Sequence, residues 1–267
     1  MSKRLQGKIA FITGAGSGIG EATALRFAEE GATVVLCGRR IEPLQGVQEK
    51  IQALGGQAEI AVADVSDEQA YVGALQATAQ RHGRLDILVN NAMAYTWGGI
   101  DTMTTADWHA NFSTTVDGTF WGTRTAMQLM KEQGGGSIVN IASICGLFGT
   151  AWMAGYSAAK AAVINFSRAA ASEGAPHNVR CNVIIPGVVD TPATASPIMS
   201  SGRRPVRSES RPDGITAQTL PAAKVASAAP AIPGPRCSTS VTNSGTSAMR
   251  SPNADHPVAK FDSSAAR

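Results

Sequence analysis

The sequence predicts an α/β fold in which helices wind around both faces of a parallel sheet. Short apolar runs alternate along the chain with longer segments of helical periodicity, and this alternation is typical of βαβ units. The runs are nearly continuous in their apolar character, as expected for strands covered on both faces. With 267 residues, 43% of them hydrophobic and 5% aromatic, the chain can form one large aliphatic core.

Six apolar runs are the predicted strands of this sheet. They occupy residues 8–12, 34–37, 59–62, 85–89, 137–141 and 179–184. In a doubly wound sheet the ligand crevice lies at the carboxyl ends of the strands, so residues that follow these runs are the candidates for function.

A glycine-rich turn follows the first predicted strand. Residues 13–20 read Thr-Gly-Ala-Gly-Ser-Gly-Ile-Gly, and a helical pattern begins at Glu21. Glycines let the backbone turn tightly and approach a pyrophosphate, while the next helix presents free N–H groups to it. The strand before the turn and the helix after it distinguish this motif from an ordinary glycine turn. It predicts a cradle for the phosphates of a bound cofactor.

Tyr156 and Lys160 are one helical turn apart, so their side chains share a helix face. A unit charge about 4 Å from a phenol, at an effective dielectric of about 20, is worth roughly 4 kcal/mol. That corresponds to a pKa lowered by about three units, into the working range of a general acid or base. Ser143 would supply a second hydroxyl to polarise the same substrate oxygen. Alone, a Tyr-x-x-x-Lys pair is more often an ordinary exposed helix face.

Taken together, these motifs resemble the short-chain dehydrogenase/reductase family in its ordinary, non-extended form. Further matches are Asp64-Val65, Asn90-Asn91-Ala92, Asn182, Pro186-Gly187 and Thr191-Pro192, and the resemblance covers residues 5 to about 195. It implies a Rossmann-type dinucleotide-binding and catalytic domain over residues 1–195. It also implies an NAD(P)-dependent oxidoreductase that transfers a hydride between a nicotinamide cofactor and a secondary alcohol or ketone.

The resemblance assigns a role to each residue of the site. Tyr156 would exchange a proton with the substrate oxygen, Ser143 would orient that oxygen, and Lys160 would lower the pKa of the phenol and hold the nicotinamide ribose. Val189 and Thr191 would contact the carboxamide. The residues expected to touch the cofactor are Gly14, Gly16, Ser17, Gly18, Ile19, Gly20, Arg39, Asp64, Val65, Asn91, Tyr156, Lys160, Val189 and Thr191.

The end of the second predicted strand bears on which cofactor is bound. NAD-preferring relatives place an acidic residue there to accept from the ribose hydroxyls, whereas this chain has Gly38 followed by Arg39 and Arg40. A guanidinium suits a ribose 2′-phosphate. NADP(H) is therefore favoured. NAD(H) is the alternative, in which an arginine stacks on the adenine or faces the solvent.

Two positions depart from the family pattern. Met93 stands where many relatives have a glycine after the Asn-Asn-Ala turn. Thr115 stands where relatives have an asparagine that holds a water connected to the active-site lysine, and Asn111 lies one helical turn too early to replace it. Because a hydroxyl can still bind water, Thr115 is predicted as a fourth, weaker member of the catalytic group.

The composition changes after about residue 195. Residues 196–267 hold nine of the thirteen prolines, thirteen serines and a single aromatic residue, and their nine Lys/Arg stand against four Asp/Glu. The preceding residues carry fourteen Lys/Arg against sixteen Asp/Glu. This predicts a low-complexity tail in place of the family's substrate lid and last strand. The alternative to a working oxidoreductase is therefore a cofactor-binding protein with little or no turnover.

Other functional classes are not expected. The basic residues of the tail are not interleaved with aromatics, as nucleic-acid binding would favour. No apolar stretch could span a bilayer, and the four cysteines and four histidines lack metal-ligand spacing. We expect a cytoplasmic protein without a metal site that acts on a small-molecule alcohol or ketone. The resemblance also implies a homodimer, because the helices after the fourth and fifth strands are the family's usual dimer faces, and it leaves a tetramer open.

Overall fold

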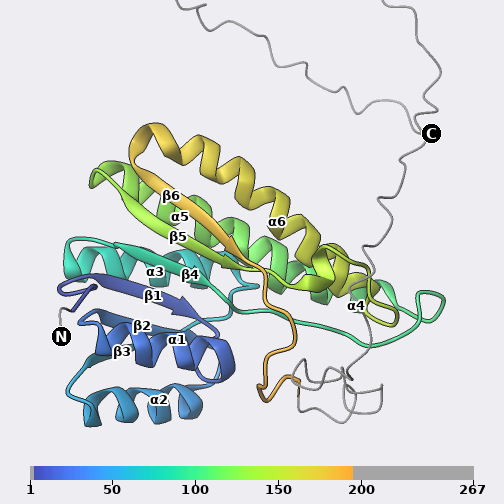
Figure 1. The fold of residues 1–267 in the computed structure, drawn as a ribbon, viewed down its shortest axis with the longest axis horizontal. Coiled ribbons are helices and arrows are strands. Elements are labelled where there is room, and N and C mark those ends of the chain that lie inside the picture. The colour runs from blue at the N-terminus through green and yellow to red at the C-terminus, as the bar shows by residue number, and fades with distance from the viewer. Residues whose placement is uncertain (1–2, 195–267) are drawn as a thin grey trace, which may run out of the picture. The chain divides into compact units, whose positions relative to one another are not determined.

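The computed structural model describes residues 3–194, and these form one six-stranded parallel sheet (Figure 1). The predicted fold class is therefore confirmed. The strand order is β3-β2-β1-β4-β5-β6, so the chain winds outward from β1 to one edge and then returns to build the other half. The strands are Ile9–Thr13 (β1), Thr33–Gly38 (β2), Gln57–Val62 (β3), Ile87–Asn90 (β4), Gly136–Ile141 (β5) and Val179–Ile184 (β6). The predicted tail, residues 196–267, lies outside the described residues.

Helices connect the strands and cover the sheet. They are Gly18–Glu29 (α1), Ile41–Ala53 (α2), Glu68–His82 (α3), Thr105–Phe112 (α4), Gly118–Glu132 (α5) and Ala154–Gly174 (α6). A π-helical turn over Ser113–Asp117 joins α4 to α5, and short 3₁₀ helices lie at Ile144–Gly146 and Ala175–His177. Among the described residues, none of the helices combines the length and the apolar character needed to cross a bilayer.

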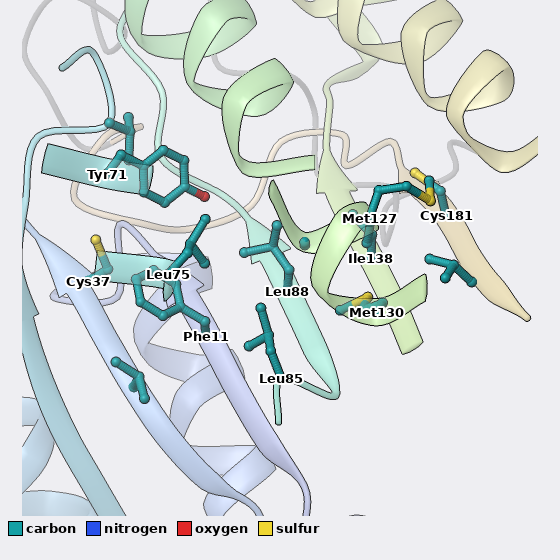
Figure 2. Packing of buried hydrophobic residues seen from close by; sticks show 14 of the residues in the cluster. Phe11, Cys37, Tyr71, Leu75, Leu85, Leu88, Met127, Met130, Ile138 and Cys181 are labelled. Carbon is teal, nitrogen blue, oxygen red and sulfur yellow. The ribbon is translucent and has the colours of Figure 1, made fainter. Parts of the chain in front are cut away.

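Alternate residues of the strands face two hydrophobic cores, because side chains along a strand point to opposite faces. Ala10 and Ile12 of β1 pack with residues of α1 and α2, whereas Phe11 packs on the other face with residues of α3 and α5. Figure 2 shows part of that second core, in which the labelled residues are Phe11, Cys37, Tyr71, Leu75, Leu85, Leu88, Met127, Met130, Ile138 and Cys181. Burial on both faces explains why the strands are nearly continuous apolar runs.

Helix α1 begins inside the glycine motif. Its first residue is Gly18, with Ser17 as the N-cap, whereas the sequence pattern placed the start at Glu21. The first-turn N–H groups, which have no intrahelical partner, therefore belong to the motif itself. This brings the positive end of the helix closer to the loop than the sequence pattern predicted.

A buried chain of polar side chains ties the centre of the sheet to its helices. Tyr71 Oη donates to Asn90 Oδ1 at 2.7 Å, Asn90 Nδ2 donates to Asn140 Oδ1 at 2.9 Å, and Asn140 Nδ2 donates to Ser167 Oγ at 2.9 Å. A Cβ on Gly122 would lie 2.4 Å from Tyr71 Oη, so α5 packs directly over this chain. Buried polar groups are tolerated when they are hydrogen-bonded, and each link here depends on the next.

Replacing Tyr71 with phenylalanine tests this network. Tyr71→Phe keeps the buried ring but leaves Asn90 Oδ1 without its donor, and we expect the free energy of unfolding to fall by about 1–3 kcal/mol. Urea denaturation followed by circular dichroism measures the change. Ser172→Ala, which deletes an exposed hydroxyl on α6, is the matched control and should cost less than about 0.5 kcal/mol. Equal midpoints for the two variants would contradict a structural role for the network.

Candidate active site

A cavity of about 380 Å³ lies at the carboxyl ends of the strands, where a doubly wound sheet binds its ligands. It runs from the segments after β2 and β3, past the glycine motif, to the segments after β5 and β6. Most of the predicted site residues line it. These are Gly14, Ser17, Gly18, Ile19, Arg39, Asp64, Val65, Asn91, Ser143, Tyr156, Lys160, Val189 and Thr191.

The glycine motif is held tightly against the turn after β4. Asn91 Nδ2 donates to Thr13 O at 2.9 Å and to Gly14 O at 3.3 Å, and the Asn91 backbone N–H donates to Thr13 Oγ1 at 2.9 Å. A Cβ on Gly20 would lie 2.2 Å from Gly14 O, and one on Gly16 would lie 2.8 Å from the Cβ of Pro43. Gly20 therefore serves the packing against Asn91, Gly16 serves the packing against α2, and neither lines the cavity.

The residues after β2 and β3 form the more polar end of the cavity. The Arg39 guanidinium lies 3.8 Å from the Asp64 carboxylate, and the Arg39 side chain is 73% exposed. Asp64 Oδ1 accepts from both the N–H and the hydroxyl of Ser66, at 2.9 and 2.8 Å. Arg40 is the N-cap residue of α2 and is not among the lining residues. Arg39 is thus the guanidinium at this end of the cavity.

At the other end, Ser143, Tyr156 and Lys160 come together from β5 and α6. Ser143 caps the short helix Ile144–Gly146, and its Oγ accepts from the Cys145 N–H at 3.2 Å. Lys160 Nζ donates to Ile141 O at 2.7 Å and lies 5.7 Å from the centroid of the Tyr156 ring. The Lys160 ammonium is thus directed to the end of β5 while it flanks the phenol.

Burial dominates the electrostatics of this group. It raises the pKa of Tyr156 above its usual value, with the Ser143 hydroxyl acting in the opposite direction, and it lowers the pKa of Lys160 to about 7. The sequence-based expectation that Lys160 would lower the phenol's pKa by about three units is therefore not met in this structure. That expectation assumed a full charge close to the phenol, whereas the buried amine carries only part of a charge near neutral pH.

Thr115 lies apart from the other three predicted catalytic residues. It is 1% exposed and does not line the cavity. Its Oγ1 accepts from the Ala94 N–H at 3.3 Å and lies 3.4 Å from Ala94 O, to which it donates. Thr114, which the sequence did not indicate, lines the cavity instead. The π-helical turn changes the rotation per residue here, and ordinary helical spacing gives no signal for it.

Several further residues, most of them apolar or aromatic, line the cavity next to Tyr156. Tyr95 lines the cavity from the segment after β4, where its ring makes an edge contact with the Tyr156 ring at a centroid distance of 6.4 Å. Met153 and Cys145 line the same end, together with Met93. The place of residues 93–97 directly after the Asn-Asn-Ala turn predicts that this segment lies near the substrate, but only the fold shows which way the Tyr95 ring points.

The part of the chain that the structure describes contains no cluster of three or more His, Cys, Asp or Glu side chains suited to a metal ion. Cys37 and Cys181 are buried, and burial raises the pKa of each thiol. Such thiols behave as small core residues.

Comparisons with known proteins agree with this geometry. A sequence model described as short chain dehydrogenase matches residues 8–198. The chain is 38% identical over 191 residues to the 3-oxoacyl-[acyl-carrier-protein] reductase FabG of Thermotoga maritima, which covers 72% of this chain and 78% of the relative. It is 41% identical over 196 residues to the 2,5-dichloro-2,5-cyclohexadiene-1,4-diol dehydrogenase LinX of Sphingobium indicum, covering 73% and 78%.

A solved structure extends the likeness to three dimensions. The crystal structure of a putative short-chain dehydrogenase/reductase from Burkholderia xenovorans superposes with a TM-score of 0.70 at 39% identity, covering 72% of this chain and 75% of that one. The resemblance found in the sequence is therefore confirmed by sequence and by fold. This chain belongs to the short-chain dehydrogenase/reductase family and is an NAD(P)-dependent oxidoreductase.

Proposed function

We propose that this chain transfers a hydride reversibly between a nicotinamide cofactor and a secondary alcohol or its ketone. The observation that carries this proposal is the convergence of Ser143, Tyr156 and Lys160 on a cavity that also contains the glycine motif. A hydroxyl, a phenol and an amine at one end supply acid, base and polarisation. The other end supplies backbone N–H groups and a guanidinium for an anionic dinucleotide.

The glycine motif passes a geometric test for the cofactor's phosphates. Gly14 and Gly18 have φ angles of 62° and 58°, which side chains larger than glycine rarely adopt, and both line the cavity. Gly14, Ser17, Gly18 and Ile19 would hold the pyrophosphate. The nicotinamide end of the cofactor would be held by Asn91, Lys160, Val189 and Thr191. The adenosine end would be held by Arg39, Asp64 and Val65. The bound cofactor supplies the carbon that gives or accepts the hydride.

Tyr156 and Ser143 act on the substrate oxygen. During ketone reduction the Tyr156 phenol donates its proton to the carbonyl oxygen as that oxygen becomes a hydroxyl. During alcohol oxidation the Tyr156 phenolate takes the hydroxyl proton. The Ser143 hydroxyl donates to the same oxygen and polarises it, because it lies on the same rim of the cavity as Tyr156. Such positioned proton transfer is worth about 10²- to 10⁴-fold in rate.

Lys160 is suited to return protons to Tyr156. Its pKa of about 7 means that the amine can gain and lose a proton near neutral pH, and it flanks the phenol ring. Because Lys160 lines the cavity, it can accept a proton there as the neutral amine and donate one as the ammonium. We assign Lys160 the double role of proton carrier and holder of the cofactor's ribose.

The preference for NADP(H) over NAD(H) rests on the residues that follow β2. Gly38 ends the strand with no carboxylate to accept from ribose hydroxyls, and Arg39 lines the cavity directly after it. The Arg39 guanidinium is mostly exposed, and its one ion pair within residues 3–194, with Asp64, is long. It can therefore turn to a ribose 2′-phosphate with little loss.

We also propose that the protein is a homodimer and that it is located in the cytoplasm. A homodimer through α5 and α6 is supported by Phe120, which is 42% exposed on α5 and makes an edge contact with Phe166 of α6. The Arg124 guanidinium lies 5.2 Å above the same Phe120 ring. A cytoplasmic location stays a prediction from the sequence. The alternative of cofactor binding with little turnover depends on residues 196–267, outside the described part.

Removing the phenol hydroxyl tests the proposed chemistry. Tyr156→Phe should lower kcat/KM by about 10²- to 10⁴-fold on a panel of secondary alcohols and ketones, because the proton donor is lost. Cofactor binding, measured by titration calorimetry, should change little. A wild-type protein that binds cofactor tightly but turns over no member of the panel would favour the alternative function. Unchanged turnover in the Tyr156→Phe variant would exclude the proposed acid and base.

The pH dependence of the reaction follows from the raised pKa of Tyr156. Alcohol oxidation needs the phenolate, and a pKa above the usual value of about 10 means that its fraction increases with pH throughout the range of about 7 to 10. We expect kcat/KM for oxidation to rise across this range, while ketone reduction, which needs the phenol, does not rise. Initial rates at constant ionic strength measure both. An oxidation rate that instead levels off above about pH 8 would show that Lys160 lowers the phenol's pKa by the roughly three units expected from the sequence.

Cofactor preference can be tested at Arg39. Arg39→Leu should raise the Kd for NADP⁺ by roughly tenfold to a hundredfold, as expected for a charge-assisted hydrogen bond of about 1.5–3 kcal/mol. The Kd for NAD⁺ should change less than about twofold. Arg40→Leu removes the neighbouring guanidinium, which does not line the cavity, and is the matched control. Equal losses for the two cofactors would contradict a role in recognising the 2′-phosphate.

A further inference from the structure

The two ends of the cavity differ in charge. Among the described residues that line it, the charged side chains are Arg39, Asp64 and Lys160. Arg39 and Asp64 follow β2 and β3, and β2 is separated from β5 by β1 and β4. At the usual strand spacing this separation is about 14 Å. Lys160 Nζ is directed to Ile141 O. The described lining around Tyr156 therefore offers no charged partner to a substrate beyond Lys160 itself.

Beside Ser143 and Cys145, much of the lining near Tyr156 is apolar or aromatic. These apolar and aromatic residues come from four segments of the chain and are Met93, Tyr95, Ile144, Met153 and Val188. The Tyr95 ring stands at 75° to the Tyr156 ring, and Tyr95 Oη donates to Ala193 O at 3.3 Å. Tyr95 thus connects the segment after β4 to the loop after β6. Its ring forms a wall beside the catalytic phenol.

Both neighbours of Tyr95 in the sequence are anchored to buried residues. The backbone of Ala94 is held by Thr115 Oγ1, at 3.3 Å from its N and 3.4 Å from its O. Asn111 Nδ2 donates to Thr96 Oγ1 at 2.8 Å, and Asn111 is completely buried. With the Ala94 backbone and the Thr96 side chain anchored on either side and its own hydroxyl bonded to Ala193, Tyr95 is held at three points.

A fixed aromatic wall favours one class of substrate. The face of an aromatic side chain offers a broad apolar surface, and a compact apolar ring can pack against it with less loss of conformational freedom than an open chain. A carboxylate or phosphate at this end would lose its hydration, and Lys160, which already donates to Ile141 O, is the one cation of the described lining that could pair with it. The described part of the lining therefore favours uncharged groups.

We propose that Tyr95 is the specificity-determining residue of this enzyme, and that its substrates are uncharged alcohols or ketones whose reacting carbon lies in an apolar ring. Thr115 is a positioning residue that holds this wall through Ala94. The proposal rests on the proposed hydride-transfer function and names the substrate class for the same site.

Three ketones of seven carbons test the proposal on the full chain. They are 4-methylcyclohexanone, the open-chain 2-heptanone, and the charged 4-oxocyclohexanecarboxylate. The wild type should show a kcat/KM for the first that is about tenfold or more above that for either of the others. Tyr95→Ala should reduce the ring preference by about fivefold or more, while Tyr95→Phe, which keeps the ring, retains it. Ile100→Ala changes an 82% exposed residue of the same segment and is the matched control.

The outcomes separate the inference from the function on which it rests. Turnover of all three ketones with the same ratios in the wild type and Tyr95→Ala overturns the inference alone. So does a wild-type preference for the carboxylate or for 2-heptanone. No turnover of any ketone by the wild type overturns the proposed function and the inference together. Thermal melting of each variant identifies a loss of activity that is due only to unfolding.

The positioning role of Thr115 can be tested separately, by measuring KM and the pH profile of kcat. Thr115→Val removes the hydroxyl but keeps the shape, and it should raise KM for 4-methylcyclohexanone several-fold and weaken the ring preference, with the pH profile of kcat unchanged. Thr115→Ser should restore both values. A fall in kcat with a shifted pH profile and an unchanged KM would show a proton relay instead and would overturn the positioning role.

Discussion

The side chain of Asn91 joins the two segments from which the cavity is built. Its amide donates to the carbonyls of Thr13 and Gly14, and its backbone N–H donates to the Thr13 hydroxyl. These bonds fasten the turn after β4 to the turn after β1, at the point where the strand order reverses. The glycine motif begins on one side of this junction, and the wall that carries Met93 and Tyr95 begins on the other. The hydrogen bonds of Asn91 therefore fix the positions of the two ends of the cavity relative to each other.

Desolvation sets the acid and base properties of the site more than direct attraction between charges does. Lys160 is 2% exposed, and the loss of hydration brings its pKa to about 7. A lysine that is only partly charged cannot stabilise a phenolate as a full point charge would, so the burial of Tyr156 decides the direction of its own shift. The same burial places the Lys160 proton in equilibrium near neutral pH, which suits an amine that passes protons to its neighbour.

The junction between α4 and α5 has a structural role that its residue types do not reveal. The π-helical turn over Ser113–Asp117 directs Thr115 to the backbone of Ala94 and leaves Thr114 on the cavity. Thr115, which the sequence suggested as a catalytic residue, thus holds the backbone of Ala94, next to Tyr95. Asn111, one turn earlier, holds Thr96 on the other side of Tyr95. The Thr115 hydroxyl and the Asn111 amide N–H therefore both find partners in this one segment.

Local patterns were enough to predict the strands of the sheet and the glycine motif. Strand and helix periodicities are local, and the carboxyl ends of parallel strands meet at one edge, so the glycine motif and Ser143 could be expected at the same crevice. The grouping of Tyr156 and Lys160 with Ser143 followed from the family resemblance that these motifs carry. Only the tertiary structure decided the start of α1 at Gly18, the direction of the Tyr156 pKa shift and the position of Tyr95. Helix caps, burial and ring orientation arise from contacts between segments distant in sequence, and residue spacing carries no record of them.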